Sequence, residues 1–194
     1  MLTNWTECED VPIPDFRDLI TPIEQQYLYD YWISKKVNGG LPCRSNLNPA
    51  DIPRLLSHIG LLDVLDGNDF RYRLIGTSMV GFFGVDYTNT LVSKSKTGKY
   101  GRILSELYRT ARDEKVPVYS ISEFTYDFKD PIQMYRLILP LSSDNLKVDM
   151  LLFSTIPEVP GHLSNNTFKV IDASNDFIEC SRILDTSSKQ ADFA

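Results

Sequence analysis

Three arginines in strand-like segments are the side chains of this sequence best suited to hold an anion. Arg71 and Arg73 alternate within residues 70–75 and would share one strand face, and Arg136 lies in a later segment of the same kind. A guanidinium can bind a carboxylate or phosphate through two parallel N–H bonds. The same side chains could instead form structural ion pairs, because a buried guanidinium needs a partner. The acidic residues available for such pairs are Asp63, Glu123 and Asp149.

Aromatic side chains, with one methionine, provide a second candidate site. They could line an apolar ligand pocket with a few polar hydroxyl groups. They could equally be plain core, each tyrosine hydroxyl bonded to a backbone group. The candidate ligand-binding set is Tyr72, Met79, Phe82, Phe83, Tyr87, Tyr108, Phe124, Tyr126, Tyr135 and Phe153.

The acidic residues form no recognisable catalytic set. Asp86 is the best candidate for proton transfer, but its position also suits a turn, and no acid stands at a known spacing from a base and a nucleophile. We therefore expect no catalytic residues, with a small isomerase- or hydrolase-like enzyme as the alternative. The two histidines, His58 and His162, and three widely separated cysteines give no metal-ligand pattern, so no metal site is predicted.

The composition limits the classes of binding partner and the cellular compartment that we expect for this protein. The chain has 194 residues and a formal charge of −6, from 20 basic and 26 acidic side chains. A negative balance speaks against binding to a nucleic-acid backbone. No apolar run is long enough to span a membrane, and the first residues lack the order of a signal peptide. We expect a cytoplasmic protein.

The elements that must position these residues begin with a helix. Thr21-Pro22-Ile23-Glu24 is a typical helix start, and aromatic and apolar residues then recur at helical spacing up to Gly39-Gly40. Two interpretations stay open. If this apolar surface is larger than one sheet face can cover, it indicates an interface with a partner; if it is not, the helix is a fully covered cap. The interface residues would be Tyr27, Leu28, Tyr31 and Trp32. A second short helix is predicted from Asn48 to Ile59.

From residue 59 the apolar pattern becomes strand-like. Segments 59–65 and 70–75 flank a turn. A three-residue loop would set Asp63 opposite Arg71, whereas a two-residue loop would shift this register by one residue. A short helix over 77–83 and a longer one over 99–115 follow, and then strands over 118–128, 133–141 and 147–156. The order predicts an α+β fold with a five-stranded antiparallel sheet, the short and long helices on one face and the N-terminal helix, through Tyr27, Tyr31 and Trp32, on the other.

The expected organisation is an extended arm over 1–20, a helical cap over 21–57, a core over 58–156 and a C-terminal extension over 157–194. Residues 168–184 could add a strand and a short helix. The last residues, 186–194, look frayed.

An ordered series of short motifs resembles the stand-alone bacterial PAS-domain proteins of the alphaproteobacterial type. The motifs, which span about residues 25–156, are Tyr31-Trp32, Leu41-Pro42-Cys43-Arg44, Asn48-Pro49-Ala50-Asp51-Ile52-Pro53, Leu61-Leu62-Asp63-Val64, Phe70-Arg71-Tyr72-Arg73-Leu74-Ile75-Gly76-Thr77, Gly84-Val85-Asp86-Tyr87-Thr88-Asn89 and Arg136-Leu137-Ile138-Leu139-Pro140-Leu141-Ser142. Asn89 and Asn145 stand where the family pattern has glycine, and asparagine tolerates the left-handed backbone that such turns need.

The resemblance implies a PAS-like sheet that cups a small cavity under its helices. It also implies a non-catalytic sensory or signalling module that binds an unknown small molecule, a signalling partner protein, or both, and that forms a homodimer through the N-terminal helix. A pure interaction adaptor, whose pocket its own side chains fill, is a further alternative. Flavin-adduct PAS domains carry a cysteine motif after the second strand and haem-binding ones a histidine on the long helix. Residues 77–82 and 99–115 lack these, so no cofactor is predicted.

Overall fold

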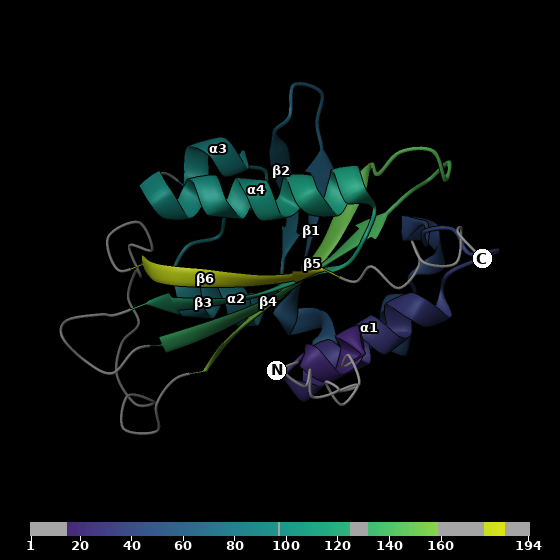
Figure 1. Ribbon diagram of the computed structural model, residues 1–194, viewed down its shortest axis with the longest axis horizontal. Coiled ribbons are helices and arrows are strands. Elements are labelled where there is room, and N and C mark those ends of the chain that lie inside the picture. The colour runs from purple at the N-terminus through teal and green to yellow at the C-terminus, as the bar shows by residue number, and fades with distance from the viewer. Residues whose placement is uncertain (1–14, 97, 125–131, 159–176, 185–194) are drawn as a thin grey trace, which may run out of the picture.

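The computed structural model describes residues 15–96, 98–124, 132–158 and, for the backbone, the strand at 177–184. One sheet lies between two helical layers (Figure 1). Before the sheet come η1 (Phe16–Leu19), α1 (Ile23–Ser34), η2 (Arg44–Asn46), η3 (Pro49–Asp51) and η4 (Pro53–His58). The sheet strands and the remaining helices are β1 (Ile59–Val64), β2 (Phe70–Ile75), α2 (Thr77–Phe83), α3 (Val92–Ser95), α4 (Gly98–Glu114), β3 (Val118–Phe124), β4 (Ile132–Leu141), β5 (Met150–Glu158) and β6 (Phe177–Leu184).

The sheet confirms the predicted α+β fold. The strand order is β2-β1-β5-β4-β3-β6, and every neighbouring pair is antiparallel. The first five of these are the predicted strands, and the register of β1 and β2 places Asp63 opposite Arg71 as expected. β6 adds a sixth strand at the β3 edge, within the part of the chain predicted as an extension.

Side-chain alternation along the strands separates two cores. Along β4, Met134 and Ile138 face α2, α3 and α4, whereas Leu137 and Leu139 face α1. Successive residues of a strand point to opposite faces, so one strand serves both cores. Figure 1 shows α4 on one side of the sheet and α1 on the other. The predicted placement of the helices is therefore confirmed.

The helix α1 covers the sheet with a different face from the one predicted. Its buried residues are Gln25, Leu28, Tyr29 and Trp32, while Tyr27 is 59% exposed and Tyr31 is half-buried. The prediction that Tyr27 contacts the sheet is therefore wrong. The helix also ends at Ser34, before the glycine pair that was expected to stop it.

The predicted helix from Asn48 is two short 3-10 turns, η3 and η4. Ile52 separates them with φ −130° and ψ 44°. Ile52 precedes Pro53, and the proline ring disfavours the helical region for the residue before it. A continuous helix cannot cross that position.

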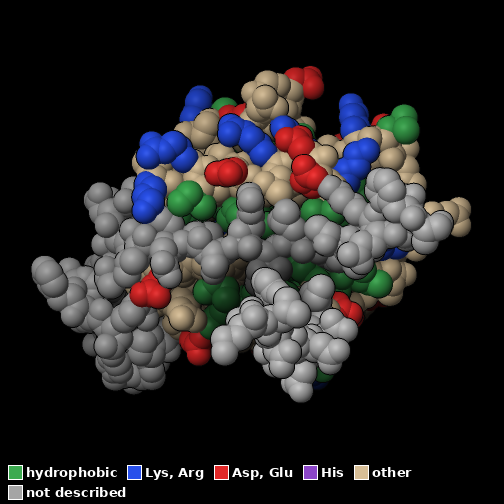
Figure 2. Space-filling model, in the orientation of Figure 1, with side chains coloured by type: hydrophobic (Ala, Val, Ile, Leu, Met, Phe, Trp, Pro, Cys, Tyr) green, Lys and Arg blue, Asp and Glu red, His purple; other side chains and the backbone are tan. Residues whose placement is uncertain are grey.

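The helix α4 turns an apolar face to the sheet. Tyr100, Leu104 and Tyr108 are buried at intervals of four residues, which places them on one side of a helix. The outer surface of this layer carries basic and acidic side chains together (Figure 2). The buried side of α4 thus supplies two tyrosines to the space above the sheet.

Candidate functional site

A small cavity lies between the sheet and the helices α2, α3 and α4, and its volume is about 20 Å³, close to the space that one water molecule needs. We call it the arginine pocket. The strands β2, β4 and β5 and the segments from α2 to α4 all contribute to its wall. The residues that line it are Tyr72, Ile75, Met79, Phe83, Tyr87, Lys96, Tyr100, Leu104, Tyr108, Arg136, Phe153 and Thr155.

Arg136 is the charged group inside this pocket. Its side chain is only 2% exposed, and its Nη2 donates a hydrogen bond of 2.6 Å to the hydroxyl of Tyr100. Its Nε and Nη1 atoms are buried with no hydrogen-bond partner. None of the ion pairs of the described residues includes Arg136. A guanidinium remains protonated in proteins, so the pocket holds a positive charge that no described carboxylate offsets.

Tyr72 and Tyr108, which line the pocket with Arg136, supply hydroxyl groups but no negative charge. Burial raises the pKa of Tyr72 well above its usual value and raises the pKa of Tyr108 to about 12. Both side chains are therefore neutral near pH 7. They can share hydrogen bonds with a ligand, yet they cannot neutralise the arginine.

A row of polar residues crosses the sheet at Arg136. Ser120 on β3 and Thr155 on β5 are its direct neighbours in the register. The Oγ atoms of Ser120 and of Ser122 are also buried without a hydrogen-bond partner. Buried polar groups without partners are rare in folded proteins, and each needs an explanation. Here four such atoms, counting the two of Arg136, belong to one sheet face.

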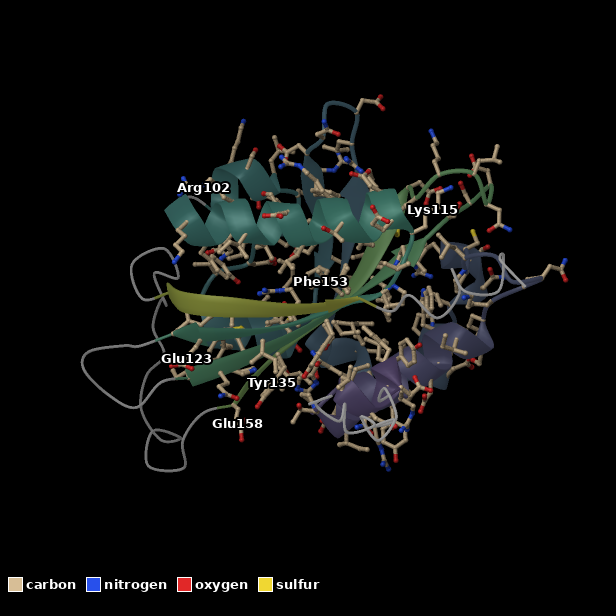
Figure 3. The ribbon with its side chains drawn as sticks, in the orientation of Figure 1. Arg102, Lys115, Glu123, Tyr135, Phe153 and Glu158 are labelled. Carbon is tan, nitrogen blue, oxygen red and sulfur yellow. The ribbon has the colours of Figure 1, made fainter. Side chains whose placement is uncertain are left out.

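The aromatic wall of the pocket is held by close packing. Gly60 on β1 lies opposite Phe153 on β5, and a Cβ atom at Gly60 would come 2.3 Å from the Phe153 ring. The missing side chain therefore lets this ring lie over β1, between the sheet and α4 (Figure 3). The Phe153 ring in turn packs edge-on against Tyr72, with ring centroids 6.0 Å apart.

Lys96 and Tyr87 form a more exposed part of the wall. The Lys96 Nζ atom lies 3.9 Å from the centroid of the Tyr87 ring and 5.0 Å from that of Phe83. All three side chains are half-buried. Cation–π contact thus places a second positive charge on the lining of the pocket, at a more solvated position than Arg136.

Six members of the predicted ligand-binding set line the arginine pocket. They are Tyr72, Met79, Phe83, Tyr87, Tyr108 and Phe153. Phe82 and Phe124 belong to the same core without lining the cavity. Tyr126 lies outside the described residues.

Tyr135 lies on the opposite face of the sheet, under α1, so the structure does not bring it to the pocket. Its hydroxyl donates to Gln133 at 2.8 Å and also to Glu158. Burial and this carboxylate raise the pKa of Tyr135 to about 12. Figure 3 shows Tyr135 beside Glu158 and away from Phe153.

Tyr100, Ile75, Leu104, Lys96 and Thr155 line the pocket but were not among the predicted residues. Spacing offered one signal. Tyr100, Leu104 and Tyr108 recur every four residues, so a ligand role for Tyr108 should have included the other two. Nothing in the sequence marks Ile75, Lys96 or Thr155.

Two of the three candidate arginines form ion pairs, and none of the ion pairs of the described residues includes the third, Arg136. Arg71 and Arg73 pair with Asp63, at 2.8 and 3.2 Å, and are 47% and 60% exposed. They form a structural ion-pair group on the strand surface. Arg136 does not pair with Glu123, because Glu123 stands opposite Gln133 in the register and its side chain is on the α1 face.

The predicted interface residues are also divided. Leu28 and Trp32 are each 1% exposed, and the Trp32 Nε1 donates to the carbonyl of Pro140 at 3.0 Å. The Tyr31 hydroxyl accepts from the backbone N–H of Asn48 at 2.8 Å. Tyr27 alone is well exposed, so a partner at this helix would meet Tyr27 and not the two core residues.

Asp86 is a turn residue. It is exposed, and its carboxylate accepts the backbone N–H of Thr88 at 2.9 Å. Hydrogen bonds from Thr88 lower the pKa of Asp86, which keeps it ionised. The nearby Asn89 has φ 67° and Asn145 has φ 62°, so both asparagines adopt the left-handed backbone expected of them.

The residues that the structure describes hold no group of three metal-ligating side chains. No helix among them is long and apolar enough to cross a membrane.

The sequence was also compared with known proteins. A family model described as a PAS domain matches residues 20–154, which is more than half of the chain. A search of curated proteins found no match. The matched range includes α1, the strands β1 to β4, most of β5 and every residue that lines the arginine pocket except Thr155.

Proposed function

Since the chain belongs to the PAS domain family, we propose that it is a non-catalytic, cytoplasmic sensory module that binds a small molecule in the arginine pocket and signals to a partner protein. The observation that carries this proposal is the buried cavity with Arg136 on its wall and two of that side chain's nitrogens unpartnered. A core that only filled space would place apolar side chains there, because an unpaired buried charge is destabilising.

The route from the pocket to the cap helix is short. Gln25 of α1 is fully buried, and its Nε2 donates to the carbonyls of Tyr135 and Ser154, at 3.1 and 3.2 Å. Those residues directly precede Arg136 and Thr155 of the pocket wall. A ligand that shifts β4 and β5 would therefore shift the groups that hold α1. A ligand can shift the equilibrium between two positions of α1 only if it makes different contacts with the protein in those two states.

A partner surface fits on the α1 side of the sheet. An apolar groove with a volume of about 230 Å³ lies beside η3, η4, β1 and β2, and Leu56 and Leu74 on its wall are 38% and 44% exposed. Exposed apolar grooves are typical of protein interaction sites. The exposed Tyr27 lies on the helix that covers this side of the sheet. The partner, a second copy of the chain or another protein, would bind at this groove, and its affinity would depend on the position of α1.

The test is a thermal-shift screen of the full chain with a panel of neutral, cationic and anionic metabolites. A ligand at 100 times its Kd should raise the Tm by about 5–10 °C for a chain of this size. The Trp5→Phe variant leaves Trp32 as the single tryptophan. Its emission should change with the same ligand, because Trp32 lies in α1.

No shift with any compound would contradict the sensory role and favour the adaptor with a filled pocket. An absorption spectrum of the purified protein tests the cofactor prediction at the same time. We expect no visible band, whereas a coloured sample would mean that haem or flavin is bound.

A further inference from the structure

We propose that the apolar groove beside η3, η4, β1 and β2 binds a medium-chain carboxylate, with the aliphatic chain in the groove and the carboxylate at Arg44. The groove is on the α1 face of the sheet, because Leu152 on its wall belongs to the core under α1, whereas the next residue, Phe153, lines the arginine pocket. The inference therefore concerns a second site. It rests on the proposed function only in that a partner protein would meet the same groove, so ligand and partner would compete there.

The wall of the groove is aliphatic. Every residue that lines it except Arg44 has an apolar side chain, and none of these side chains is aromatic. Within the described part of the chain, Leu56 and Leu74 remain 38% and 44% exposed. Clustered apolar surface that stays open to solvent is typical of a binding site. A wall without rings or side-chain hydroxyls offers a saturated chain many dispersion contacts, but offers no surface for aromatic stacking.

The size of the groove fits a chain of about eight carbon atoms. Its volume is about 230 Å³. An apolar cavity of about 150 Å³ holds benzene, which has six carbon atoms. In proportion, this groove has room for about eight or nine. The space thus suits a medium-chain ligand, and a much longer chain would extend into solvent.

Arg44 adds a positive charge to the apolar wall. Its Nη1 donates to the carbonyl of Leu47 at 3.0 Å, and Leu47 also lines the groove. This bond holds the guanidinium beside the wall. None of the ion pairs of the described residues includes Arg44. Its Nε and Nη2 atoms can therefore offer two parallel donors to the oxygens of a carboxylate.

The strand surface beside the groove has the same sign of charge. Arg71 and Arg73 share the carboxylate of Asp63, which leaves one positive charge unbalanced within this group. Arg73 directly precedes Leu74 of the groove wall. This local charge contrasts with the formal charge of −6 of the whole chain. The surroundings of the groove thus favour an anionic head group over a cationic one.

The first experiment measures chain length by isothermal titration of the full chain with hexanoate, octanoate, decanoate and dodecanoate. We expect binding to tighten about 2- to 4-fold with each added methylene up to decanoate, because each methylene leaves water. Dodecanoate should bind little more tightly than decanoate, because its last carbons lie outside the groove. No saturable binding of octanoate up to about 5 mM would overturn the inference, as would affinity that rises without a plateau.

The second experiment tests the head group with octanoate, neutral octanamide and cationic octylamine at pH 7. Octanoate should bind about 2- to 5-fold more tightly than octanamide, because an exposed ion pair contributes modestly. Octylamine should bind more weakly than either. Arg44→Gln should remove the preference of octanoate over octanamide while keeping the dependence on chain length. Equal or tighter binding of octylamine by the natural chain would contradict a carboxylate site.

A pair of leucine variants locates the site. Leu74→Glu places a negative charge on the groove wall and should weaken octanoate binding by at least about 10-fold. Leu146→Glu is the matched control, because Leu146 is 76% exposed and does not line the groove, and it should bind octanoate as the natural chain does. Octanoate binding that a folded Leu74→Glu variant retains in full would contradict the proposal. If that variant does not fold, Arg44→Gln still tests the site.

Two further measurements separate the alternatives. Light scattering tests a second copy of the chain as the occupant: a dimer that Leu74→Glu dissociates, and that octanoate does not, would overturn the proposal. Arg136→Met should bind octanoate as the natural chain does, because Arg136 lines the arginine pocket on the other face of the sheet. Octanoate binding lost in a folded Arg136→Met variant would contradict the groove as the site. Arg136-dependent shifts with other metabolites, without octanoate binding, would refute this inference and leave the sensory role standing.

Discussion

Replacing Arg136 by methionine should leave the ligand-free protein as stable as before, or make it more stable. The side chain is 2% exposed and its charge has no described acidic partner. Exchanging a buried charge for an apolar side chain of similar volume stabilises by up to about 4 kcal/mol. Loss of the hydrogen bond to Tyr100 costs about 1 kcal/mol. The net change in the free energy of unfolding is therefore between zero and about +3 kcal/mol.

Urea and thermal unfolding, followed by circular dichroism after thorough dialysis, measure this change. The gain corresponds to a rise in Tm of up to about 10 °C. The matched control is Arg71→Met, which breaks an exposed ion pair with Asp63 and should change stability by less than about 1 kcal/mol. If Arg136 instead had a buried acidic partner in the chain, the variant would lose about 3–5 kcal/mol. A loss of that size would refute the reasoning.

Three more predictions follow from the pocket and its surroundings. Gly60→Ala should lower the free energy of unfolding by about 1–3 kcal/mol in urea, because its Cβ would meet the Phe153 ring at 2.3 Å. Gly81→Ala, with no atom within 4 Å, should not destabilise and serves as control. Gln25→Leu removes the bonds to β4 and β5 and should leave ligand affinity nearly unchanged while abolishing the ligand-induced change in tryptophan emission; an unaltered emission response would refute the coupling. Stability should fall between about pH 10 and 12, because burial raises the pKa of Tyr108 to about 12 and the folded state then holds a proton that the unfolded state has lost. Tyr108→Phe should make that fall smaller in unfolding measured across the same pH range, and an unchanged fall would contradict it.

Local patterns were enough to predict the sheet. The alternation of residues 59–65 and 70–75 around a turn predicts the hairpin, and the observed pairing of Asp63 with Arg71 is the one expected for a three-residue loop, one of the two loop lengths considered. The Asn89 and Asn145 turns were predictable because asparagine accepts a positive φ. These features depend on contacts close in the sequence.

The covering face of α1 could not be read from hydrophobicity. Gln25 is buried because its amide reaches the backbone of two strands, whereas the apolar Ile23 and Tyr27 are 51% and 59% exposed. The polar Gln25 lies on the face of α1 that covers the sheet because it has hydrogen-bond partners there, and the apolar Tyr27 does not. Which face covers the sheet depends on how the helix is placed on the strands, and the sequence pattern does not show that placement.

The environment of Arg136 depended on the register between the consecutive strands β3 and β4, which the sequence pattern did not fix. A slip of one residue between β3 and β4 would exchange the faces of the strand and bring Glu123 to the side of Arg136. The sequence therefore left both the ion pair and the anion site open, and it favoured the ion pair. In the register observed, Ser120 stands opposite Arg136, and the acidic residue lies on the other face.

The central claim is that the arginine pocket receives a small molecule from outside the chain. The most direct measurement is a crystal structure of the full chain purified straight from its host, with attention to the electron density beside Arg136. We predict density for a small molecule whose oxygen atoms lie within hydrogen-bond distance of the Arg136 Nε or Nη1 atoms, which have no partner in the structure described here. A pocket closed by a carboxylate of the chain itself would contradict the claim.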